Sequence, residues 1–189
     1  LHAVGCKALL TTSSVGVLDA SVPLFVPMLA GDLMMPDNRL PDGSACTMFD
    51  TPRPDHGHLV VQGGIFSSSL GAQIRSIAAD IGVAMGPDVV FAYVAGPRTK
   101  TPAENRMWAR LGAQVNSMTV GPEVVLANEL GMPCAGLLVG HKHSWGNAEA
   151  LSAISASLES SRAATQALIT AVVRRLEPVS FENSLYRFS

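Results

Sequence analysis

The chain has 189 residues, 48% of them hydrophobic and 15% charged, with a formal net charge of −2. Such a chain can bury the core of one domain, residues 1–189, and its small negative charge gives no reason to expect binding to nucleic acid or to anionic membranes. Its three cysteines lie far apart and no apolar run reaches the length of a membrane span, so we expect a cytoplasmic protein with no disulfide framework and no membrane partner.

The first expected strand covers residues 6–12 (CKALLTT) and leads into Ser13 and Ser14. Side-chain O–H groups and backbone N–H groups at the end of a strand can converge on an anion. The same residues would also suit an ordinary polar turn, so both interpretations stay open.

The second expected strand begins only after residue 32, because Pro27 cannot donate a hydrogen bond inside a sheet. Residues 36–54 are rich in Pro, Asp and Gly and predict a long loop. His56 and His58 follow, two residues apart, so on a strand their side chains would face the same way. A metal-binding pair is conceivable, but no third ligand is evident nearby, and a solvated loop is the plainer interpretation.

A helix is expected over residues 70–81, where apolar residues recur at helical spacing, and Gly82 ends it. A buried strand over residues 88–95 follows. The next helix begins with Thr101 as its N-cap and with Glu104 as the partner in a capping box.

Three apolar side chains of this second helix are expected to face the core: Met107, Trp108 and Leu111. A short strand over residues 114–119 and a helix over residues 121–131 complete a second strand–turn–helix unit. Ligands of open α/β sheets sit at the turns that follow the strands, so these two units are where we expect a binding site.

Residues 134–139 predict another buried strand, which ends in a turn that carries His141 and His143. Alternation within this turn would point both rings to the same side, and both titrate near neutral pH, so they can donate or accept a proton. A plain surface turn would explain them equally well. A long helix capped by Asn147 follows, and the tail beyond that helix is expected to be peripheral.

Polar residues therefore gather at the ends of four expected strands, where they could converge on one edge of the sheet. Hydroxyl and amide groups of this kind suit a phosphate or a sugar. The four clusters are Thr12–Ser14, Pro97–Lys100, Asn116–Thr119 and His141–Ser144.

The run from Ala95 to Pro133 (AGPRTKTPAENRMWARLGAQVNSMTVGPEVVLANELGMP) resembles the trimeric purine nucleoside phosphorylase and methylthioadenosine phosphorylase family. It shares with that family a Gly-Pro pair, a helix with Ala-Glu, a Gly-Ala, a Met-Thr and a Pro-Glu-Val-Val-Leu-Ala. Ser13–Leu18 and Ala30–Asn38 resemble its Ala-x-Gly-x-Leu and Pro-Gly-Asp stretches, and His141–Trp145 takes the place of its catalytic turn. The resemblance covers most of residues 1–176.

The resemblance implies an α/β fold of the nucleoside-phosphorylase type, a mixed sheet flanked by helices, in a homotrimer with sites at subunit interfaces. It implies phosphorolysis, in which phosphate attacks the anomeric carbon of a purine-type nucleoside while the base leaves. Phosphate is then a co-substrate, and neither a cofactor nor a metal is expected.

Carried over by position, Ser13 and Thr119 would touch phosphate, and Ser14 would offer its backbone to phosphate or to the base. His141, with His143 as the second candidate, would be the general acid to the leaving base. The nucleoside-binding positions would be Thr99, Lys100, Ser117 and Met118, with Met118 against the ribose. His58 would contact the neighbouring subunit.

Three positions depart from the pattern of the family. Thr99 replaces an aromatic residue that stacks on the base, and Lys100 replaces the Glu of the enzymes for 6-oxopurines. His141 stands where the family has Asp or Asn. These changes suggest a different base, a different leaving group or no catalysis.

The N-terminal part of the family, with its glycine-rich phosphate loop, is not found in these 189 residues. We therefore expect that residues precede Leu1, that a partner chain supplies the loop or that phosphate binding is lost. Two alternatives to a phosphorylase follow: a non-catalytic paralogue that supports a partner, and a nucleoside hydrolase that uses water.

Overall fold

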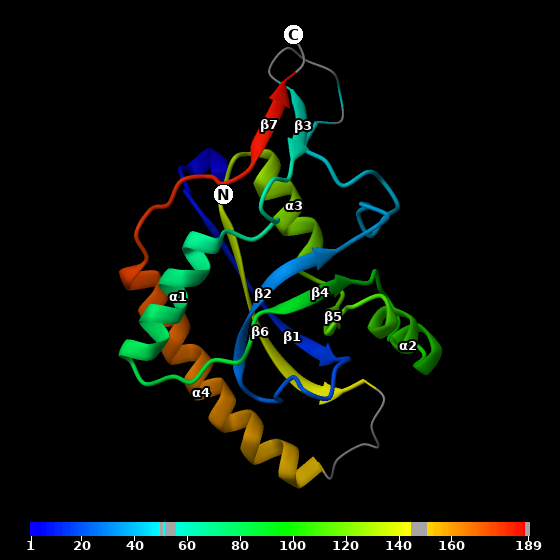
Figure 1. Cartoon of the computed structure of the whole chain (residues 1–189), viewed down its shortest axis with the longest axis vertical. Coiled ribbons are helices and arrows are strands. Elements are labelled where there is room, and N and C mark those ends of the chain that lie inside the picture. Colours follow the sequence, from blue (N-terminus) through cyan, green and yellow to red (C-terminus); the bar gives the residue numbers. More distant parts are fainter. Residues whose placement is uncertain (50, 52–55, 145–150, 188–189) are drawn as a thin grey trace.

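Five strands of the computed structural model, which describes residues 1–49, 51, 56–144 and 151–187, wind into a closed barrel in the order β1–β5–β4–β2–β6 (Figure 1). The barrel strands are β1 (Leu9–Val17), β2 (Pro27–Met34), β4 (Val89–Tyr93), β5 (Val115–Ser117) and β6 (Cys134–His143). The pairs β1–β6, β2–β4 and β4–β5 are parallel, and β1–β5 and β2–β6 are antiparallel. The predicted mixed α/β fold is confirmed.

The helices cover the barrel, and a small two-stranded sheet projects from one end (Figure 1). The helices are η1 (His2–Val4), α1 (Ser68–Asp80), α2 (Pro102–Arg110), α3 (Gly121–Glu129) and α4 (Leu151–Arg175), and the projecting strands are β3 (Gly57–Val60) and β7 (Ser184–Arg187). None of the helices within the described ranges is long and apolar enough to cross a bilayer.

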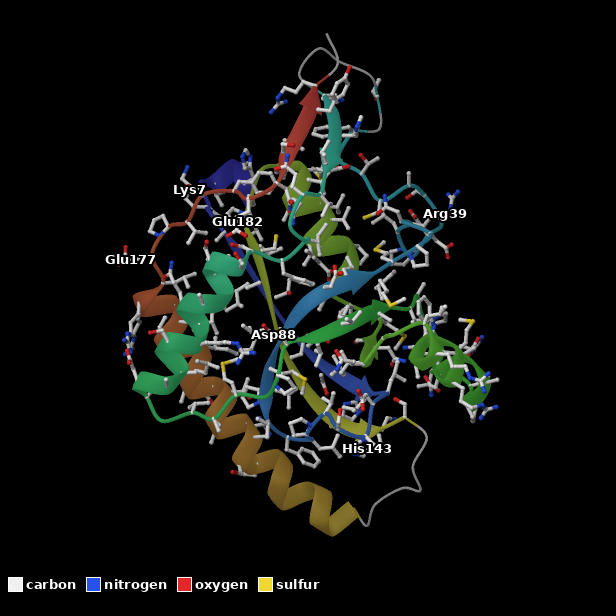
Figure 2. All side chains as sticks on the ribbon, in the orientation of Figure 1. Lys7, Arg39, Asp88, His143, Glu177 and Glu182 are labelled. Carbon is white, nitrogen blue, oxygen red and sulfur yellow. The ribbon has the colours of Figure 1, made fainter. Side chains whose placement is uncertain are left out.

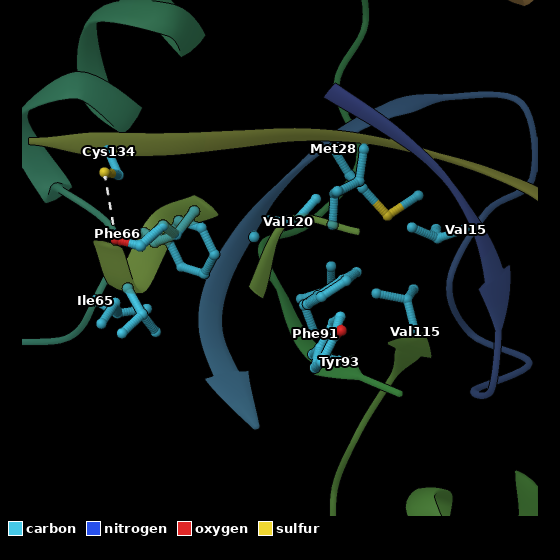
Figure 3. Close-up of a cluster of buried hydrophobic side chains, with 14 of the residues drawn as sticks. Val15, Met28, Ile65, Phe66, Phe91, Tyr93, Val115, Val120 and Cys134 are labelled. Atoms are coloured by element: carbon cyan, nitrogen blue, oxygen red, sulfur yellow. Dashed lines mark hydrogen bonds between the residues drawn. The ribbon is translucent and has the colours of Figure 1, made fainter. Parts of the chain in front are cut away.

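The interior of the barrel is filled by aliphatic and aromatic side chains from all five strands (Figure 3). Val15, Met28, Phe91 and Val115 are completely or almost completely buried there. A second cluster joins α1 and α4 to the outer face of β6, with Leu70, Ile74, Leu137, Leu168 and Val172 at its centre. Both helices therefore lie side by side against the barrel (Figure 1).

The first two strands do not have their predicted bounds. β1 continues to Val17, so Ser13 and Ser14 lie inside a strand and not in a turn after it. The extension is stabilised by parallel pairing with β6 and by the burial of Val15 and Val17. β2 begins at Pro27 and not after residue 32, because a proline is tolerated as the first residue of a strand.

The predicted helix over residues 70–81 is confirmed, and so is the capping box of α2. The Thr101 hydroxyl accepts a hydrogen bond from the Glu104 N–H at 3.2 Å, and the Glu104 carboxylate accepts one from the Thr101 N–H at 2.7 Å. The prediction that Met107 and Leu111 face the core is wrong, since they are 48% and 60% exposed.

The C-terminal tail is more than a peripheral extension. Its strand β7 pairs with β3, and its Glu182 carboxylate caps the start of α1 (Figure 2). Glu182 accepts hydrogen bonds from the N–H groups of Ser68 and Ser69 and from the hydroxyls of Ser67 and Ser68, all between 2.9 and 3.0 Å. The tail thus fixes the first turn of a helix more than 100 residues earlier in the chain. The predicted cap Asn147 lies outside the described residues.

Candidate active site

Three hydroxyl groups from two neighbouring strands form one hydrogen-bonded cluster. Ser13 lies in β1, Ser117 ends β5, and Thr119 follows it two residues later. The Ser13 Oγ lies 2.8 Å from Thr119 Oγ1 and 3.3 Å from Ser117 Oγ, and the last two oxygens are 3.3 Å apart. The cluster is partly exposed, so its O–H groups can turn towards an anion. The structure therefore brings together Ser13 and Thr119, as the sequence led us to expect.

His141 is held by Ser14, the residue that follows Ser13 in β1. The Ser14 Oγ is 2.9 Å from the His141 Nδ1. The β1–β6 ladder pairs Val15 with Gly140 and Gly16 with Lys142, so His141 is an extra residue with no partner across the ladder. This is a β-bulge, a feature that often redirects a side chain next to a functional site.

The bulge separates the two histidines that were predicted to point to the same side. His143 pairs with Val17, which is completely buried, and its Nδ1 is buried without a hydrogen-bond partner among the described residues. Paired residues of neighbouring strands share a face, so His143 points inward while His141 stays beside Ser14. The expectation of a turn is wrong as well, because β6 extends to His143 at the far end of the strand (Figure 2).

A cavity of about 430 Å³ opens between β1, β6 and α4. Ser13, Ser14 and His141 line it from the barrel side, and the opposite wall comes from residues 161–170 of α4. The complete lining is Thr12, Ser13, Ser14, Leu137, Val139, His141, Ser161, Arg162, Thr165, Gln166, Ile169 and Thr170. Its size is within the range of pockets that hold small molecules.

The electrostatic environment of His141 favours the neutral ring. Burial lowers the pKa of His141, and the positive charge of Lys142 lowers it further, while a backbone hydrogen bond with Val15 opposes them. The protonated form is therefore less populated at neutral pH than for an ordinary histidine.

The loop after β4 forms the next part of the site. Gly96 lies so close to Met118 that a Cβ at Gly96 would be 2.9 Å from the Met118 sulfur. Thr99 is exposed on this loop. Lys100 is half-buried, and its pKa is lowered by burial and by Lys142, with Glu104 acting in the opposite direction. The charge of Lys142 thus acts on both Lys100 and His141.

Two buried asparagines support the site; Asn116 belongs to a polar cluster that the sequence indicated, whereas Asn105 was not identified from the sequence. Asn105 of α2 donates to the Ser144 carbonyl at 2.9 Å, and Asn116 of β5 donates to the Asn105 side chain at 3.2 Å. Both asparagines are 5% exposed. Thr101, Asn105 and Trp108 are spaced so that they share one face of α2. This spacing could have predicted that their face, and not the face that carries Met107, packs inward.

His58 is not part of this site. It lies on β3 in the projecting sheet, where its ring stacks on Tyr186 at a centroid distance of 5.0 Å. Within the described part of the chain, no three His, Cys, Asp or Glu side chains are grouped so that they could hold a metal ion.

Comparison with known proteins adds a family match that covers nearly all of this chain. Residues 1–174 match the phosphorylase superfamily. The probable S-methyl-5′-thioinosine phosphorylase of Methanopyrus kandleri is 32% identical over 135 residues, which are 69% of this chain and 48% of the relative. The probable 6-oxopurine nucleoside phosphorylase of Moorella thermoacetica is 42% identical over 73 residues, which are 39% of this chain and 28% of the relative. The chain thus spans about half or less of the length of these relatives.

Solved structures share the fold at lower identity. The S12T mutant of adenosine/methylthioadenosine phosphorylase from Schistosoma mansoni, in complex with adenine, matches with a TM-score of 0.76 and 19% identity, over 92% of this chain and 65% of that one. A methylthioadenosine phosphorylase from an antarctic soil metagenomic library matches with a TM-score of 0.76 and 18% identity, over 91% of this chain and 60% of that one.

Proposed function

Because this chain belongs to the phosphorylase superfamily, in the group of the purine nucleoside and methylthioadenosine phosphorylases, we propose that it is a pentosyltransferase. It would cleave the N-glycosidic bond of a purine-type nucleoside by phosphorolysis. The observation that carries the proposal is that two consecutive residues of β1 hold both groups: Ser13 belongs to the hydroxyl cluster with Ser117 and Thr119, and Ser14 contacts His141.

The hydroxyl cluster is the proposed site for phosphate. Its O–H groups are donors, and we propose that Lys100 and Lys142, whose charges interact with each other, add positive charge for the anion. Phosphate held there would attack the anomeric carbon: a phosphate oxygen forms the new C–O bond while the C–N bond to the base breaks and its electron pair stays on the base. Donors that are fixed before the reaction stabilise the charge that develops during it.

His141 is the residue that we place against the leaving base. It lines the 430 Å³ cavity together with Ser13 and Ser14, so a nucleoside there would be contacted by both parts of the site. The base gains negative charge as the glycosidic bond breaks, and a donor at its ring nitrogen lowers the energy of that state. We propose Met118 as the contact for the ribose and Thr99, Lys100 and Ser117 as further contacts for the nucleoside. His143, whose ring points inward, has no proposed contact with the ligand.

A nucleoside panel, with and without phosphate, tests the proposed reaction. Inosine, guanosine, adenosine, xanthosine and 5′-methylthioadenosine are incubated with the protein, and free base is measured by chromatography. Release that requires phosphate and yields a sugar 1-phosphate supports the proposal. Release without phosphate indicates a hydrolase, and the absence of release across the panel overturns catalysis in favour of a non-catalytic role.

The 5′-substituent is decided by the same panel. The Methanopyrus kandleri relative is named after a nucleoside that carries a methylthio group at the 5′ position. Turnover of 5′-methylthioadenosine is therefore compared with turnover of adenosine. The ratio of kcat/KM between them measures the preference.

We also propose a cytoplasmic homotrimer. The three cysteines are free thiols, which suits a reducing compartment. The projecting β3–β7 sheet exposes Val60, Val61 and Tyr186 beside His58, and a two-stranded sheet is marginally stable without further packing. Light scattering coupled to size exclusion should give three times 19.8 kDa. His58→Glu should reduce that mass if this sheet contacts the neighbouring subunit.

A further inference from the structure

The proposed reaction uses His141, but it does not by itself require the contact between His141 and Ser14. The bulge leaves His141 without a partner across the β1–β6 ladder, and Ser14 Oγ lies 2.9 Å from its Nδ1. Ser14 and His141 both line the cavity. The Ser14 hydroxyl therefore engages Nδ1, and Nε2 is the second polar atom of a ring that also has a hydrogen bond with the Val15 backbone.

The positive charge of Lys142 acts on this ring, and Arg162, a cation that lines the cavity, lies 4.0 Å from the carboxylate of Glu159. Lys142 is the next residue of β6, Lys100 precedes α2 and interacts with Lys142, and Arg162 of α4 lines the opposite wall of the cavity. In the part of the chain that the structure describes, no carboxylate forms an ion pair with His141, and Glu104 is occupied by Arg98. Burial and the charge of Lys142 disfavour the imidazolium and outweigh the hydrogen bond with the Val15 backbone, so the neutral ring is the favoured form.

A neutral imidazole carries its proton on one nitrogen only, and the hydrogen bond at the other nitrogen selects which one. A serine hydroxyl is able to donate to a bare Nδ1. When it does so, the ring proton must be on Nε2, and Nε2 becomes a donor.

We propose that Ser14 is a positioning residue: its hydroxyl donates to Nδ1 of His141 and fixes the neutral ring with the proton on Nε2, where it donates a hydrogen bond to the leaving base. The inference rests on the proposed function for the identity of the ligand. It replaces an imidazolium acid with a neutral donor, a role that histidine fills where its surroundings disfavour the charged form. The hydrogen bond strengthens as the base gains electron density, and solvent then provides the proton.

Nitrogen-15 NMR of histidine-labelled protein tests the tautomer without any substrate. In the wild type we expect His141 to show a protonated Nε2 and a bare Nδ1. In Ser14→Ala we expect a mixture of the two tautomers and a higher pKa of His141, because a donor to the neutral form has been removed. A wild-type ring that is protonated at Nδ1, or a Ser14→Ala spectrum identical to that of the wild type, overturns the proposal.

Ser13→Ala is the matched control for this experiment. Ser13 precedes Ser14 in β1 and lines the same cavity, but its hydroxyl contacts Ser117, Thr119 and the Ser14 backbone carbonyl, and not His141 or the Ser14 hydroxyl. The His141 resonances of Ser13→Ala should therefore match those of the wild type. Ser14→Thr keeps a hydroxyl and should restore the wild-type tautomer.

Kinetics then distinguish positioning from a general structural defect. The donor matters most when the base carries charge, so Ser14→Ala should lower kcat by about tenfold with little change in KM, the size expected for one misplaced hydrogen bond. The acid limb of its pH profile should move to higher pH together with the pKa of His141. Equal effects on kcat and KM with an unmoved acid limb overturn the positioning role. If no nucleoside is cleaved by the wild type, the proposed function fails, and the NMR result still decides the role of Ser14.

Discussion

Ser13 carries the shortest contact of the hydroxyl cluster, 2.8 Å to Thr119, and we propose that both residues bind phosphate. We predict that Ser13→Ala and Thr119→Val each raise the KM for phosphate by about tenfold, because each removes one hydrogen bond to a charged ligand. The measurement is initial rate against phosphate concentration at saturating nucleoside. Thr12→Val is the control, since Thr12 is the preceding residue of β1 and makes no side-chain hydrogen bond among the described residues; an equal effect there would contradict the prediction.

His141 is predicted to work as a neutral ring, which fixes the direction of the pH dependence. Its pKa is lowered from 6.5, chiefly by burial. Activity should therefore be present at neutral pH and be lost as the pH falls through this lowered pKa, where the ring gains a proton and a charge. The measurement is kcat/KM between pH 4.5 and 8.

Two substitutions of His141 separate the donor from the titrating group. His141→Asn retains an N–H donor and should keep part of the activity while losing the acid limb. His141→Ala should lower kcat on the order of 10²-fold, the usual size for a donor to a developing charge. Full turnover by His141→Ala would exclude this residue from the reaction.

At the scale of elements, Gly16 sets the distance between β1, β5 and the end of β6. A Cβ at this position would lie 2.5 Å from Ser144 Oγ and 3.1 Å from Asn116 Oδ1. Gly16→Ala should therefore destabilise the protein by about 1–3 kcal/mol, the usual cost of overpacking. The measurement is urea unfolding. The double variant Gly16→Ala/Ser144→Ala removes the closest atom and should recover part of the loss; purely additive effects would contradict the clash.

Glu182 joins the C-terminal tail to the first turn of α1. Replacing its carboxylate by the amide in Glu182→Gln removes a charge that accepts several hydrogen bonds from serines 67–69, so we predict a loss of about 1–3 kcal/mol. Unfolding free energy and hydrogen exchange at the start of α1 are the measurements. Glu177→Gln, a substitution in the same tail whose side chain makes no hydrogen bond among the described residues, should be nearly neutral.

The sequence predicted helices and strands well where the signal lies in neighbouring residues. It predicted them less well where pairing with another strand determines the bounds of an element. The Thr101 capping box depends on residues three apart, and the structure confirms it. The end of β1 depends on the length of β6, which lies more than 100 residues away, and no local pattern shows it. The position of His141 depends on a bulge, which changes the alternation of side chains and is visible only from the pairing of both strands.

Across the whole molecule, the carboxylates with shifted pKa values point to lower stability in acid. Burial raises the pKa of Glu182, but the hydrogen bonds from the serines outweigh it, and the result is about 2 in place of 4.5. The pKa of Glu104 is also lowered to about 2, first by its hydrogen bond with Arg98. A lowered pKa in the folded state gives a stabilisation that is complete above the unfolded value and disappears as the pH falls through the folded value.

We therefore predict that the free energy of unfolding falls as the pH is lowered from about 5 to about 2, because the unfolded and folded pKa values of these two carboxylates span this range. Chemical denaturation at a series of pH values is the measurement. Glu182→Gln should show a shallower decline than the wild type, because one of the titrating groups is gone. A stability that is constant over this range would contradict the prediction.

The family and the fold class could be predicted from the sequence, and the arrangement of the site only in part. Ser13, Ser117 and Thr119 meet, although Ser13 lies inside β1 and not at its end as the strand-end pattern predicted. The cavity wall on α4 was not predicted, because Arg162 and Gln166 have no distinguishing pattern on a helix and gain their position only from packing against β1 and β6.

The bulge in β6 has a consequence for how this site can change over generations. Gly140 and Lys142 already pair with consecutive residues of β1, so the ladder does not use His141. Loss of this single codon would leave the sheet continuous and remove the imidazole. A residue outside the ladder is also open to replacement by others, since no hydrogen bond of the sheet is disturbed. The barrel and the group that we propose to face the base can thus diverge separately, which would give one scaffold access to several leaving groups.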